Sequence, residues 1–492
     1  MTAPPSFGPF RNCRVHLIGI GGCGMSGAAA MLLQMGADVS GSDMGDFEGL
    51  GTLVSRGARI AIGHRSDLVQ PGTDLVVISA AVPDTNPELV EARRRNLPVI
   101  KYAELLGRLM SHRVGVAIAG THGKSTTTAL AAWLLRNAGL NPSFIFGAKS
   151  DQLGGPSGVD RGKHFVVEAC EFDRSFLQLR PRLAAILNVE RDHLDCYMSF
   201  DELVDAFALF AGQVAPDGLL VCNSNDPIAI QAAAATAATI ETFGFDEAAD
   251  WRAIHLECDL GRFRFDVAYR GKVLLSTHLS IPGRFNVANA LAATALAHHA
   301  GADEDDLAAA MPDFLGIQRR LSWCGYGQGV TIVDDYAHHP TEIKVTIGAA
   351  RDRYQPKRMF VVFQPHQYAR TCDLMDEFAD SFADADEIIV PDIYAAREPG
   401  ARVAEGSAKL VERICAHGRQ ARYLPTLADV AQTVVDEVRD GDLVVTMGAG
   451  DVWKIAHELV EKLCGPDATG CAAGTHDLVP AGRQRPMPVP AA

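Results

Sequence analysis

The chain has 492 residues, of which 48% are hydrophobic, and its formal net charge is −15. A chain of this length is expected to form about three or four domains. The acidic excess and the lack of a long basic run argue against nucleic acid as a partner. No apolar run approaches the ~20 residues that a membrane helix needs, so no membrane partner is expected.

The N-terminal segment MTAPPSFGPF has neither the basic start nor the apolar core of a secretory signal. The 11 cysteines are scattered singly and form no C-x-x-C pair. This usage favours reduced thiols over a zinc site or a disulfide framework. We therefore expect a cytoplasmic protein. We also expect it to be a monomer or a weak homodimer.

Short apolar runs, each followed by glycine and a helix-like segment, recur along the chain. Such alternation predicts an α/β fold with parallel sheets covered by helices. The pattern restarts near residues 14, 114 and 330, which indicates three α/β domains. The predicted strands are Val15–Ile20, Leu75–Ile78, Val114–Ala119, Phe165–Val167, Leu183–Leu187, Val330–Val333, Met359–Phe363, Glu387–Val390 and Leu443–Thr446.

Two stretches depart from this alternation. Residues 251–282 are rich in β-formers and contain turn signals at Asp259–Gly261 and Arg270–Gly271, which predicts an antiparallel ribbon. Residues 465–492 are rich in glycine, proline and alanine without periodicity, which predicts a disordered tail.

The strongest chemical signal is GTHGKST, which lies between a predicted buried strand and a helix-like segment. Strand, glycine loop, Lys-Ser and helix is the context of a phosphate-binding P-loop, although the spacing is shorter than the usual G-x-x-x-x-G-K-[ST]. Backbone N–H groups, the helix N-terminus and Lys124 would bind phosphates, and the Ser125 hydroxyl could ligate Mg²⁺. The loop residues are Gly120, Thr121, His122, Gly123, Lys124, Ser125 and Thr126.

A second glycine loop, GIGGCGMSG, follows the first predicted strand. It contains G-x-G-x-x-G at Gly19, Gly21 and Gly24, and Asp43 follows about 20 residues later, where a ribose-binding acid would lie. The residues alone fit a dinucleotide such as NAD, another nucleotide diphosphate such as a UDP-sugar, or tight strand–helix packing without a ligand.

Polar residues also gather at the ends of later strands. Glu168 ends one strand, and a polar cluster over residues 188–195, including His193, follows the next; carboxylates facing a P-loop are expected Mg²⁺ partners. Asn286 and Asn289 lie at spacing i, i+3 on one face of a predicted helix, which suits either nucleotide binding or a helix cap.

The last third of the chain repeats this arrangement. Asp334 and Asp335 end one strand, and His366 and Arg370 follow the next. Ligands of open α/β sheets bind at the carboxyl ends of strands, so we expect the clusters of all three domains to converge. Arg320, just before this region, could stabilise charge during phosphoryl transfer.

Together these motifs resemble the Mur ligase family over roughly residues 12–462, and within it the alanine-adding branch. The motifs in the family's order are GIGGCGMSG with GSD, ISAAVPDTNPE, GTHGKST, EACEFDRSFLQLRP, NVERDHLDCY, GRFNVANALAA, DDYAHHPTE, FQPHQYARTCDL and MGAGD.

The resemblance implies three domains: a Rossmann-like UDP-substrate domain (1–108), a central P-loop ATPase domain (109–316) and a Rossmann-like domain that closes on the amino acid (317–464). It also implies the chemistry. ATP would phosphorylate the lactyl carboxylate of UDP-N-acetylmuramate, and the amine of L-alanine would attack the acyl phosphate. ATP and Mg²⁺ are the implied cofactors.

The resemblance also implies residue roles. Lys124 and Ser125 would serve the phosphates and magnesium, with Glu168 at the first metal and His193 at the second. Asn286, Asn289, Arg320 and Asp335 would contact ATP, the last at its ribose. His366, Arg370 and His193 would contact the reacting substrates. Gly19, Gly21, Gly22, Gly24, Asp43 and Ser79 would bind the UDP-sugar.

Four positions depart from the family pattern: Cys170 replaces an acid, Leu321 a phenylalanine, Gln367 an arginine, and Ser125 a threonine whose hydroxyl it keeps. The loss of the arginine bears on amino-acid selectivity. Residues 200–217 contain no lysine, whereas later-acting members use a carbamylated lysine there, which fits the alanine-adding branch.

Three alternatives remain at this stage. A murein-peptide recycling ligase would share the fold and chemistry but attach a preformed peptide. The first glycine loop alone would suit an NAD-dependent oxidoreductase. A non-catalytic ATP-binding protein is the third, which an intact set of Lys124, Glu168 and His193 disfavours.

Overall fold

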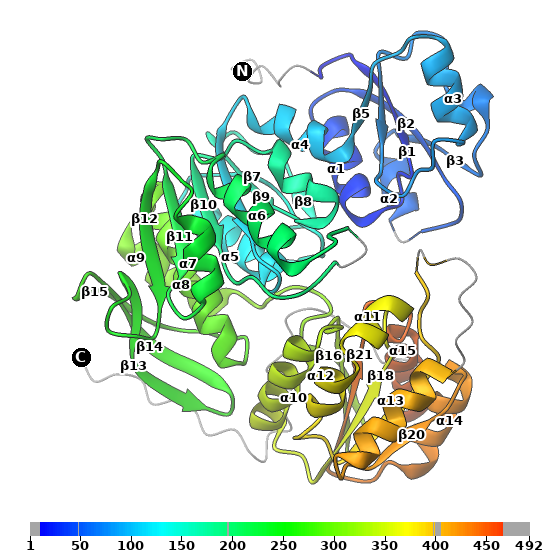
Figure 1. Cartoon of the computed structure of the whole chain (residues 1–492), viewed down its shortest axis with the longest axis vertical. Helices are drawn as coiled ribbons and strands as arrows, with labels where there is room; N and C mark the ends of the chain where they lie inside the picture. Colours follow the sequence, from blue (N-terminus) through cyan, green and yellow to red (C-terminus); the bar gives the residue numbers. More distant parts are fainter. Residues whose placement is uncertain (1–9, 48, 194–195, 397, 399–404, 466–492) are drawn as a thin grey trace. The chain divides into compact units, whose positions relative to one another are not determined.

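The computed structural model describes residues 10–47, 49–193, 196–396, 398 and 405–465, so the predicted tail lies outside the described residues (Figure 1). The chain forms two compact units. The first contains the described residues up to Leu256 with Arg264–Thr277 and Asn286–Phe314. The second contains Glu257–Phe263, His278–Phe285 and the described residues from Leu315 onward. Three sheets, each with helices, make up these units.

The N-terminal sheet has five parallel strands in the order β3-β2-β1-β4-β5, with its first strand in the centre. This is a doubly wound arrangement in which ligands bind where the strand order reverses. Its elements are β1 (Arg14–Ile18), α1 (Cys23–Gln34), β2 (Asp38–Asp43), α2 (Leu50–Ser55), β3 (Arg59–Ile62), the 3₁₀ turn η1 (Ser66–Leu68), β4 (Leu75–Ile78), α3 (Pro87–Arg94), β5 (Val99–Lys101) and α4 (Tyr102–Met110).

The central sheet has ten strands in the order β15-β14-β13-β12-β11-β10-β6-β9-β7-β8. The strand that leads into the P-loop, β6, lies inside it between two parallel neighbours. Its elements are β6 (Val114–Ala119), α5 (Lys124–Asn137), β7 (Ser143–Ile145), β8 (Ser157–Gly158), β9 (His164–Glu168), η2 (Phe172–Gln178), β10 (Leu183–Ile186), α6 (Phe200–Ala211), β11 (Leu219–Asn223), α7 (Pro227–Ala233), β12 (Thr239–Gly244), β13 (Trp251–Asp259), β14 (Arg262–Tyr269), β15 (Lys272–His278), α8 (Arg284–His299), α9 (Glu304–Ala310) and η3 (Met311–Asp313).

The predicted ribbon is confirmed as β13, β14 and β15, which are neighbours in the sheet and joined by two-residue connections. Leu260–Gly261 and Arg270–Gly271 form these connections, and all four residues have positive φ. Positive φ at both central positions defines the hairpin turn whose twist matches that of the strands.

The C-terminal sheet has six strands in the order β16-β17-β21-β18-β19-β20, and only its edge strand β16 is antiparallel. Its elements are β16 (Ser322–Gly327), β17 (Val330–Asp335), α10 (Pro340–Tyr354), β18 (Arg358–Phe363), α11 (Tyr368–Asp373), α12 (Met375–Asp380), β19 (Glu387–Val390), α13 (Glu405–Ala416), β20 (Ala421–Tyr423), α14 (Leu427–Glu437), β21 (Asp442–Met447) and α15 (Trp453–Cys464).

Both faces of the C-terminal sheet carry a hydrophobic core. Val333, Val361 and Val445 belong to one cluster, and their chain neighbours Ile332 and Val444 belong to another. Successive residues of a strand point to opposite faces, so the sheet is buried on both sides by helices, as parallel sheets generally are. Among the described residues no helix is both long and apolar enough to span a membrane.

The strand boundaries differ slightly from those predicted. The first strand ends at Ile18 rather than Ile20, because Gly19 turns the chain with φ 79°. Strand β17 continues past Val333 to Asp335, whose partner in β21 is Met447. Asp334 and Asp335 therefore belong to the strand itself and are buried.

Candidate functional site

The P-loop forms a tight turn between β6 and α5 that requires its two glycines. Gly120 has φ 142° and Gly123 has φ 80°. A Cβ on Gly120 would lie 2.9 Å from that of Leu187, and one on Gly123 would lie 2.6 Å from Oδ1 of Asn289. These contacts are too short for any larger residue, and α5 begins directly after the turn at Lys124.

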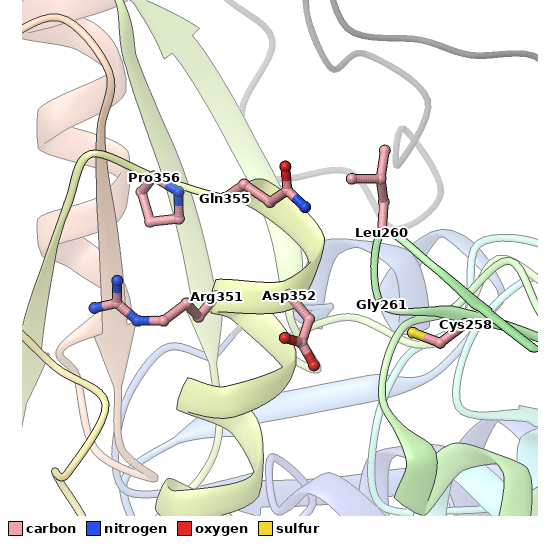
Figure 2. A pocket seen from close by; sticks show the side chains of 7 residues that line it. All are labelled: Cys258, Leu260, Gly261, Arg351, Asp352, Gln355 and Pro356. Atoms are coloured by element: carbon pink, nitrogen blue, oxygen red, sulfur yellow. The ribbon is translucent and has the colours of Figure 1, made fainter.

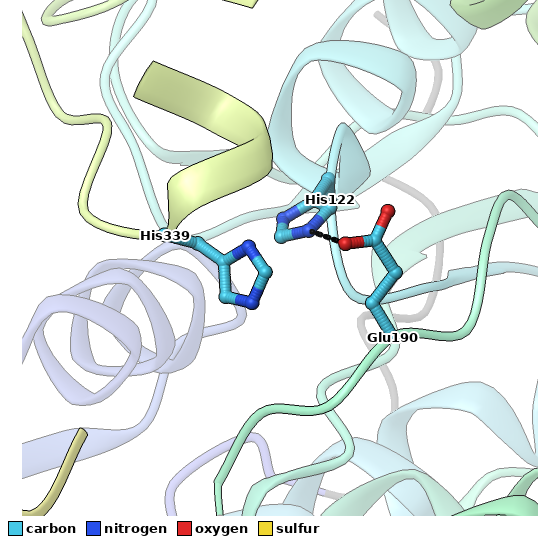
Figure 3. Close-up of side chains that lie close together, drawn as sticks. All are labelled: His122, Glu190 and His339. Atoms are coloured by element: carbon cyan, nitrogen blue, oxygen red, sulfur yellow. Dashed lines mark ion pairs between the residues drawn. The ribbon is translucent and has the colours of Figure 1, made fainter. Parts of the chain in front are cut away.

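The P-loop is held by the chain that leaves the adjacent strand β10. Asn188 accepts the N–H of Thr121 with its carbonyl (3.0 Å) and that of His122 with its side chain (2.7 Å). The Thr121 hydroxyl in turn accepts the N–H of Glu190 (2.8 Å). The imidazole of His122 and the carboxylate of Glu190 form an ion pair of 3.4 Å, which Figure 3 shows.

Lys124 is a largely buried cation that donates to several acceptors. Its Nζ donates to the carbonyls of Gly120 (2.5 Å) and Thr121 (3.0 Å), and to Oε1 of Glu171 (3.0 Å). Burial acts to lower the pKa of Lys124, but the nearby Glu171, Cys170 and Glu168 raise it above its ordinary value. Lys124 is therefore charged at neutral pH, as phosphate binding requires.

Ser125 and Glu168 form the second pair at the loop. The Ser125 hydroxyl donates to Oε2 of Glu168 (2.8 Å), and the same oxygen accepts the N–H of Gly147 (2.6 Å). A hydroxyl and a carboxylate oxygen at this distance are the ligand types that Mg²⁺ prefers. The predicted proximity of a strand-end carboxylate to the P-loop is thus present in the structure.

Glu171 contacts two predicted site residues, Lys124 and His193, although no motif predicted a role for it. Its side chain is only 1% exposed, and its Oε2 lies 2.9 Å from Nζ of Lys124. Nε2 of His193 lies 3.5 Å from its Oε1, so the structure brings His193 to Glu171. Burial and the charge of Glu171 raise the pKa of the Cys170 thiol to about 12, which keeps it neutral.

Asn286 and Asn289 lie on α8 beside the P-loop and are both buried. Nδ2 of Asn289 donates to Oδ1 of Asn286 (3.1 Å), and Oδ1 of Asn289 faces Gly123. The fold therefore places the amide of Asn289 next to the P-loop, and Asn289 in turn is bonded to Asn286.

The first glycine loop is anchored to the end of β2. The carbonyl of Ser42 accepts the N–H groups of Gly19 (2.9 Å) and Ile20 (3.0 Å), and Oδ2 of Asp43 accepts that of Gly21 (2.8 Å). The other oxygen of Asp43 accepts the N–H of Met44 (2.8 Å). Asp43 thus shapes the loop directly, and the ribose role remains a prediction.

The remaining predicted residues of this loop are closely surrounded. A Cβ on Gly21 would lie 2.5 Å from the ring of Phe47, and one on Gly24 would lie 2.6 Å from that of Tyr102. A Cβ on Gly19 would lie 3.1 Å from Oγ of Ser79, so Ser79 lies beside the loop. The loop accepts no side chain at these glycines.

In the C-terminal sheet, Asp335 organises the backbone around Arg320. One carboxylate oxygen accepts the N–H of Leu321 (2.7 Å) and the other that of Ala337 (2.7 Å). Burial raises the pKa of Asp335 to about 6, while Arg320 acts against this shift. Nη1 of Arg320 lies 3.4 Å from Glu342, and its guanidinium lies over the ring of Tyr336.

His366 and Arg370 form a pair after β18. Nη1 of Arg370 lies 3.1 Å from Nδ1 of His366, whose ring stacks on Tyr394. Between them, Gln367 has φ 69° at the N-terminus of α11. Glu398 accepts the first N–H groups of this helix, from Tyr368 (2.6 Å) and Ala369 (3.2 Å). The turn that carries His366 and Arg370 is therefore held by hydrogen bonds from its backbone to Glu398.

The second unit also contains a cavity of about 500 Å³ at the end of α10 (Figure 2). None of the predicted site residues lines it. Arg351, one of its lining residues, already donates to the carbonyl of Asp384 and to Asp386. The lining residues are Cys258, Leu260, Gly261, Arg351, Asp352, Gln355 and Pro356.

Comparison with protein families gives three consecutive matches. Residues 14–114 match the Mur ligase family catalytic domain, residues 118–297 the Mur ligase middle domain, and residues 319–450 the Mur ligase glutamate ligase domain. Together these matches span most of the chain.

Two curated relatives are named UDP-N-acetylmuramate–L-alanine ligase. The one from Caldanaerobacter subterraneus is 40% identical over 91% of this chain and 97% of its own length. The one from Anaeromyxobacter dehalogenans is 42% identical over 92% of this chain and 98% of its own length.

Solved structures agree with these relatives. A UDP-N-acetylmuramate-alanine ligase from Thermotoga maritima has a TM-score of 0.78 at 27% identity, covering 91% of this chain and 98% of that one. A murein peptide ligase from Psychrobacter arcticus has a TM-score of 0.68 at 25% identity, with the same coverage. With three consecutive domain matches and relatives 40% identical over nine tenths of its length, this chain belongs to the Mur ligase family.

Proposed function

We propose that this protein is an ATP-dependent ligase that joins L-alanine to the lactyl carboxylate of UDP-N-acetylmuramate. ATP would phosphorylate the carboxylate, and the amine would then attack the acyl phosphate and release phosphate. The observation that carries the proposal is the P-loop, where the cation of Lys124 lies beside the Ser125–Glu168 pair. The names of the full-length relatives support the choice of substrates.

In this proposal the P-loop holds the triphosphate. Lys124 is charged and close to the loop carbonyls, so a small movement of its flexible side chain would bring Nζ to the β and γ phosphates. Asn286 and Asn289, beside Gly123, would contact ATP, and Arg320 and Asp335 would contribute from the C-terminal sheet. Phosphoryl transfer relies mainly on such positioning and charge stabilisation.

The residues present fit a magnesium ion. Ser125 and Glu168 supply oxygen ligands 2.8 Å apart, and the N–H of Gly147 fixes one carboxylate oxygen in place. When bound, Mg²⁺ would neutralise charge on the phosphates. His193, held 3.5 Å from Glu171, is proposed for the second metal site.

We assign the loop from Gly19 to Gly24, with Asp43 and Ser79, to the UDP-sugar rather than to NAD. The loop leads directly into α1, and the N-terminus of that helix favours a diphosphate. The paired side chains of His366 and Arg370 are assigned to the reacting carboxylate and amine.

The second candidate is a murein-peptide ligase, which would attach a preformed peptide to the same sugar nucleotide. The likeness to the Psychrobacter arcticus enzyme keeps this alternative open, although its TM-score of 0.68 is below the 0.78 of the alanine ligase.

The test is phosphate release from ATP with UDP-N-acetylmuramate and a varied amine. The expected result is rapid release with L-alanine and little with L-alanyl-γ-D-glutamyl-meso-diaminopimelate. Faster release with the tripeptide would favour the second candidate. If phosphate release did not depend on UDP-N-acetylmuramate, both candidate functions would be contradicted.

A further inference from the structure

A buried polar network in the N-terminal sheet centres on Glu88, in the first turn of α3. Its side chain is 0% exposed, and it contacts residues from three other segments. Its Oε2 lies 2.6 Å from Nε2 of His16 on β1, and its Oε1 lies 2.9 Å from Nδ1 of His64, which follows β3. The Ser42 hydroxyl, on β2, lies 2.8 Å and 2.9 Å from the two carboxylate oxygens.

The network holds Glu88 as a fixed negative charge. Burial acts to raise its pKa, but hydrogen bonds from His16, Ser42 and His64 lower that pKa below its usual value. The start of α3 adds favourable potential, because a helix N-terminus stabilises a carboxylate. The far nitrogen of His16 lies 2.9 Å from Oγ of Ser40, so both sides of this imidazole are paired.

Ser42 connects this charge to the first glycine loop. Its hydroxyl contacts Glu88, while its carbonyl accepts the N–H groups of Gly19 and Ile20. The side chain of the next residue, Asp43, accepts the N–H of Gly21. The carbonyl of Asp43 accepts the N–H of Gly63 (2.7 Å), which directly precedes His64. The end of β2 is therefore hydrogen-bonded both to the Glu88 network and to the loop.

We propose that Glu88 is a positioning residue for the sugar-nucleotide site and acts through Ser42 and His64. This inference rests on the assignment of the loop from Gly19 to Gly24 to the UDP-sugar. A residue that only stabilised the N-terminal sheet would change folding but not ligand selectivity. A positioning residue changes affinity for one ligand and leaves affinity at the P-loop, which belongs to another sheet, unaltered.

The test compares Glu88→Gln with the wild type by calorimetric titration of the full-length protein. Glutamine keeps the shape of the side chain but lacks its charge. Its amide nitrogen replaces one carboxylate oxygen and would face a group that donates to Glu88 in the wild type. The expected result is a Kd for UDP-N-acetylmuramate raised by about 10-fold to 100-fold, the range that outer-shell partners contribute at metal sites. The Kd for a non-hydrolysable ATP analogue should stay within about twofold of the wild-type value, because Lys124 and its loop are untouched.

Glu91→Gln is the matched control, since it removes a carboxylate from the same helix that pairs, within the described part of the chain, with Arg94 and Arg95. It should leave both Kd values unchanged. Ser42→Ala removes the hydroxyl but keeps the carbonyl that holds the loop, and it should raise the sugar-nucleotide Kd alone. This variant decides the matter if Glu88→Gln does not fold.

The outcomes separate the two claims. If Glu88→Gln and Ser42→Ala bind UDP-N-acetylmuramate as tightly as the wild type does, the positioning role is wrong and the proposed function stands. If a variant bound UDP-N-acetylmuramate and the ATP analogue more weakly by the same factor, this would indicate a general loss of structure. That result would also overturn the positioning role. If the wild type does not bind UDP-N-acetylmuramate, the proposed function fails and the inference fails with it.

Discussion

Nζ of Lys124 lies 2.9 Å from Oε2 of Glu171, a carboxylate that is almost completely buried. The lysine therefore has two separable tasks, because it balances a buried charge and is proposed to bind phosphate. A buried carboxylate that loses its partner destabilises a protein strongly, whereas loss of both charges need not.

We predict that Lys124→Ala lowers ATP-dependent phosphate release by at least about 100-fold. It should also lower the free energy of unfolding by about 3–5 kcal/mol, because the buried Glu171 loses the cation of Lys124. Adding Glu171→Gln should restore much of the stability but none of the activity. The measurements are phosphate release and urea unfolding, with the exposed Lys272→Ala as control. Full turnover in Lys124→Ala would contradict the mechanism.

The Ser125–Glu168 pair gives a prediction about magnesium. Glu168→Gln replaces one ligand oxygen with an amide nitrogen, which cannot ligate Mg²⁺. The Mg²⁺ concentration for half-maximal activity should therefore rise by about 10-fold to 100-fold. A magnesium titration of phosphate release measures this. Asp217→Asn, which removes an exposed carboxylate paired with Arg182, is the control and should behave as the wild type. An unchanged titration in Glu168→Gln would remove this residue from the metal site.

Asp335 gives a prediction about pH. Its pKa is about 6 in the folded chain against an ordinary value of 3.8, so the folded state binds the proton more tightly. The stability that the protonated Asp335 carboxyl gives the folded chain is therefore present at low pH and is lost as the pH rises through 6. Between pH 5 and 7.5 the wild type should lose about 1.4 kcal/mol of unfolding free energy relative to Asp335→Asn. Urea unfolding at both pH values tests this, and a pH-independent difference would show that the carboxyl does not titrate in this range.

Gln367 gives a prediction about the amine. The resemblance to the family implies arginine at this position, and a guanidinium can bind a carboxylate with two hydrogen bonds. If the turn that carries His366 and Arg370 contacts L-alanine, Gln367→Arg should lower the KM for L-alanine by about tenfold, equivalent to ~1.4 kcal/mol. The KM for ATP should not change. Gln432→Arg, an exposed change of the same kind on α14, is the control. An unchanged KM for L-alanine would place amine recognition elsewhere.

Much of the fold was predictable because its signals are local. The strand Val114–Ala119 is an apolar run that ends at a glycine, and the structure confirms its bounds. The ribbon was predictable from two glycine-containing turns between β-forming runs. Strand β16 was not predicted, because its sequence SWCGYG contains two glycines and lacks a continuous apolar run.

The site was predictable where a motif carries it and not where contacts are long-range. The P-loop and Glu168 follow from residues near one another in the chain or at strand ends. The pairing of Lys124 with Glu171 spans 47 positions, and that of His16 with Glu88 spans 72, so no spacing rule indicates either. Both depend on which strands lie side by side, which only the sheet order provides.

Two N–H groups of the P-loop, those of Thr121 and His122, are already bonded to Asn188. Fixing the backbone of a residue costs about 1–2 kcal/mol in conformational entropy. The P-loop loses this entropy when the central sheet folds, and not when ATP binds. Nucleotide binding should accordingly show a small entropic penalty, and substitutions at Asn188 should weaken ATP binding through its entropy, not through lost contacts with the nucleotide.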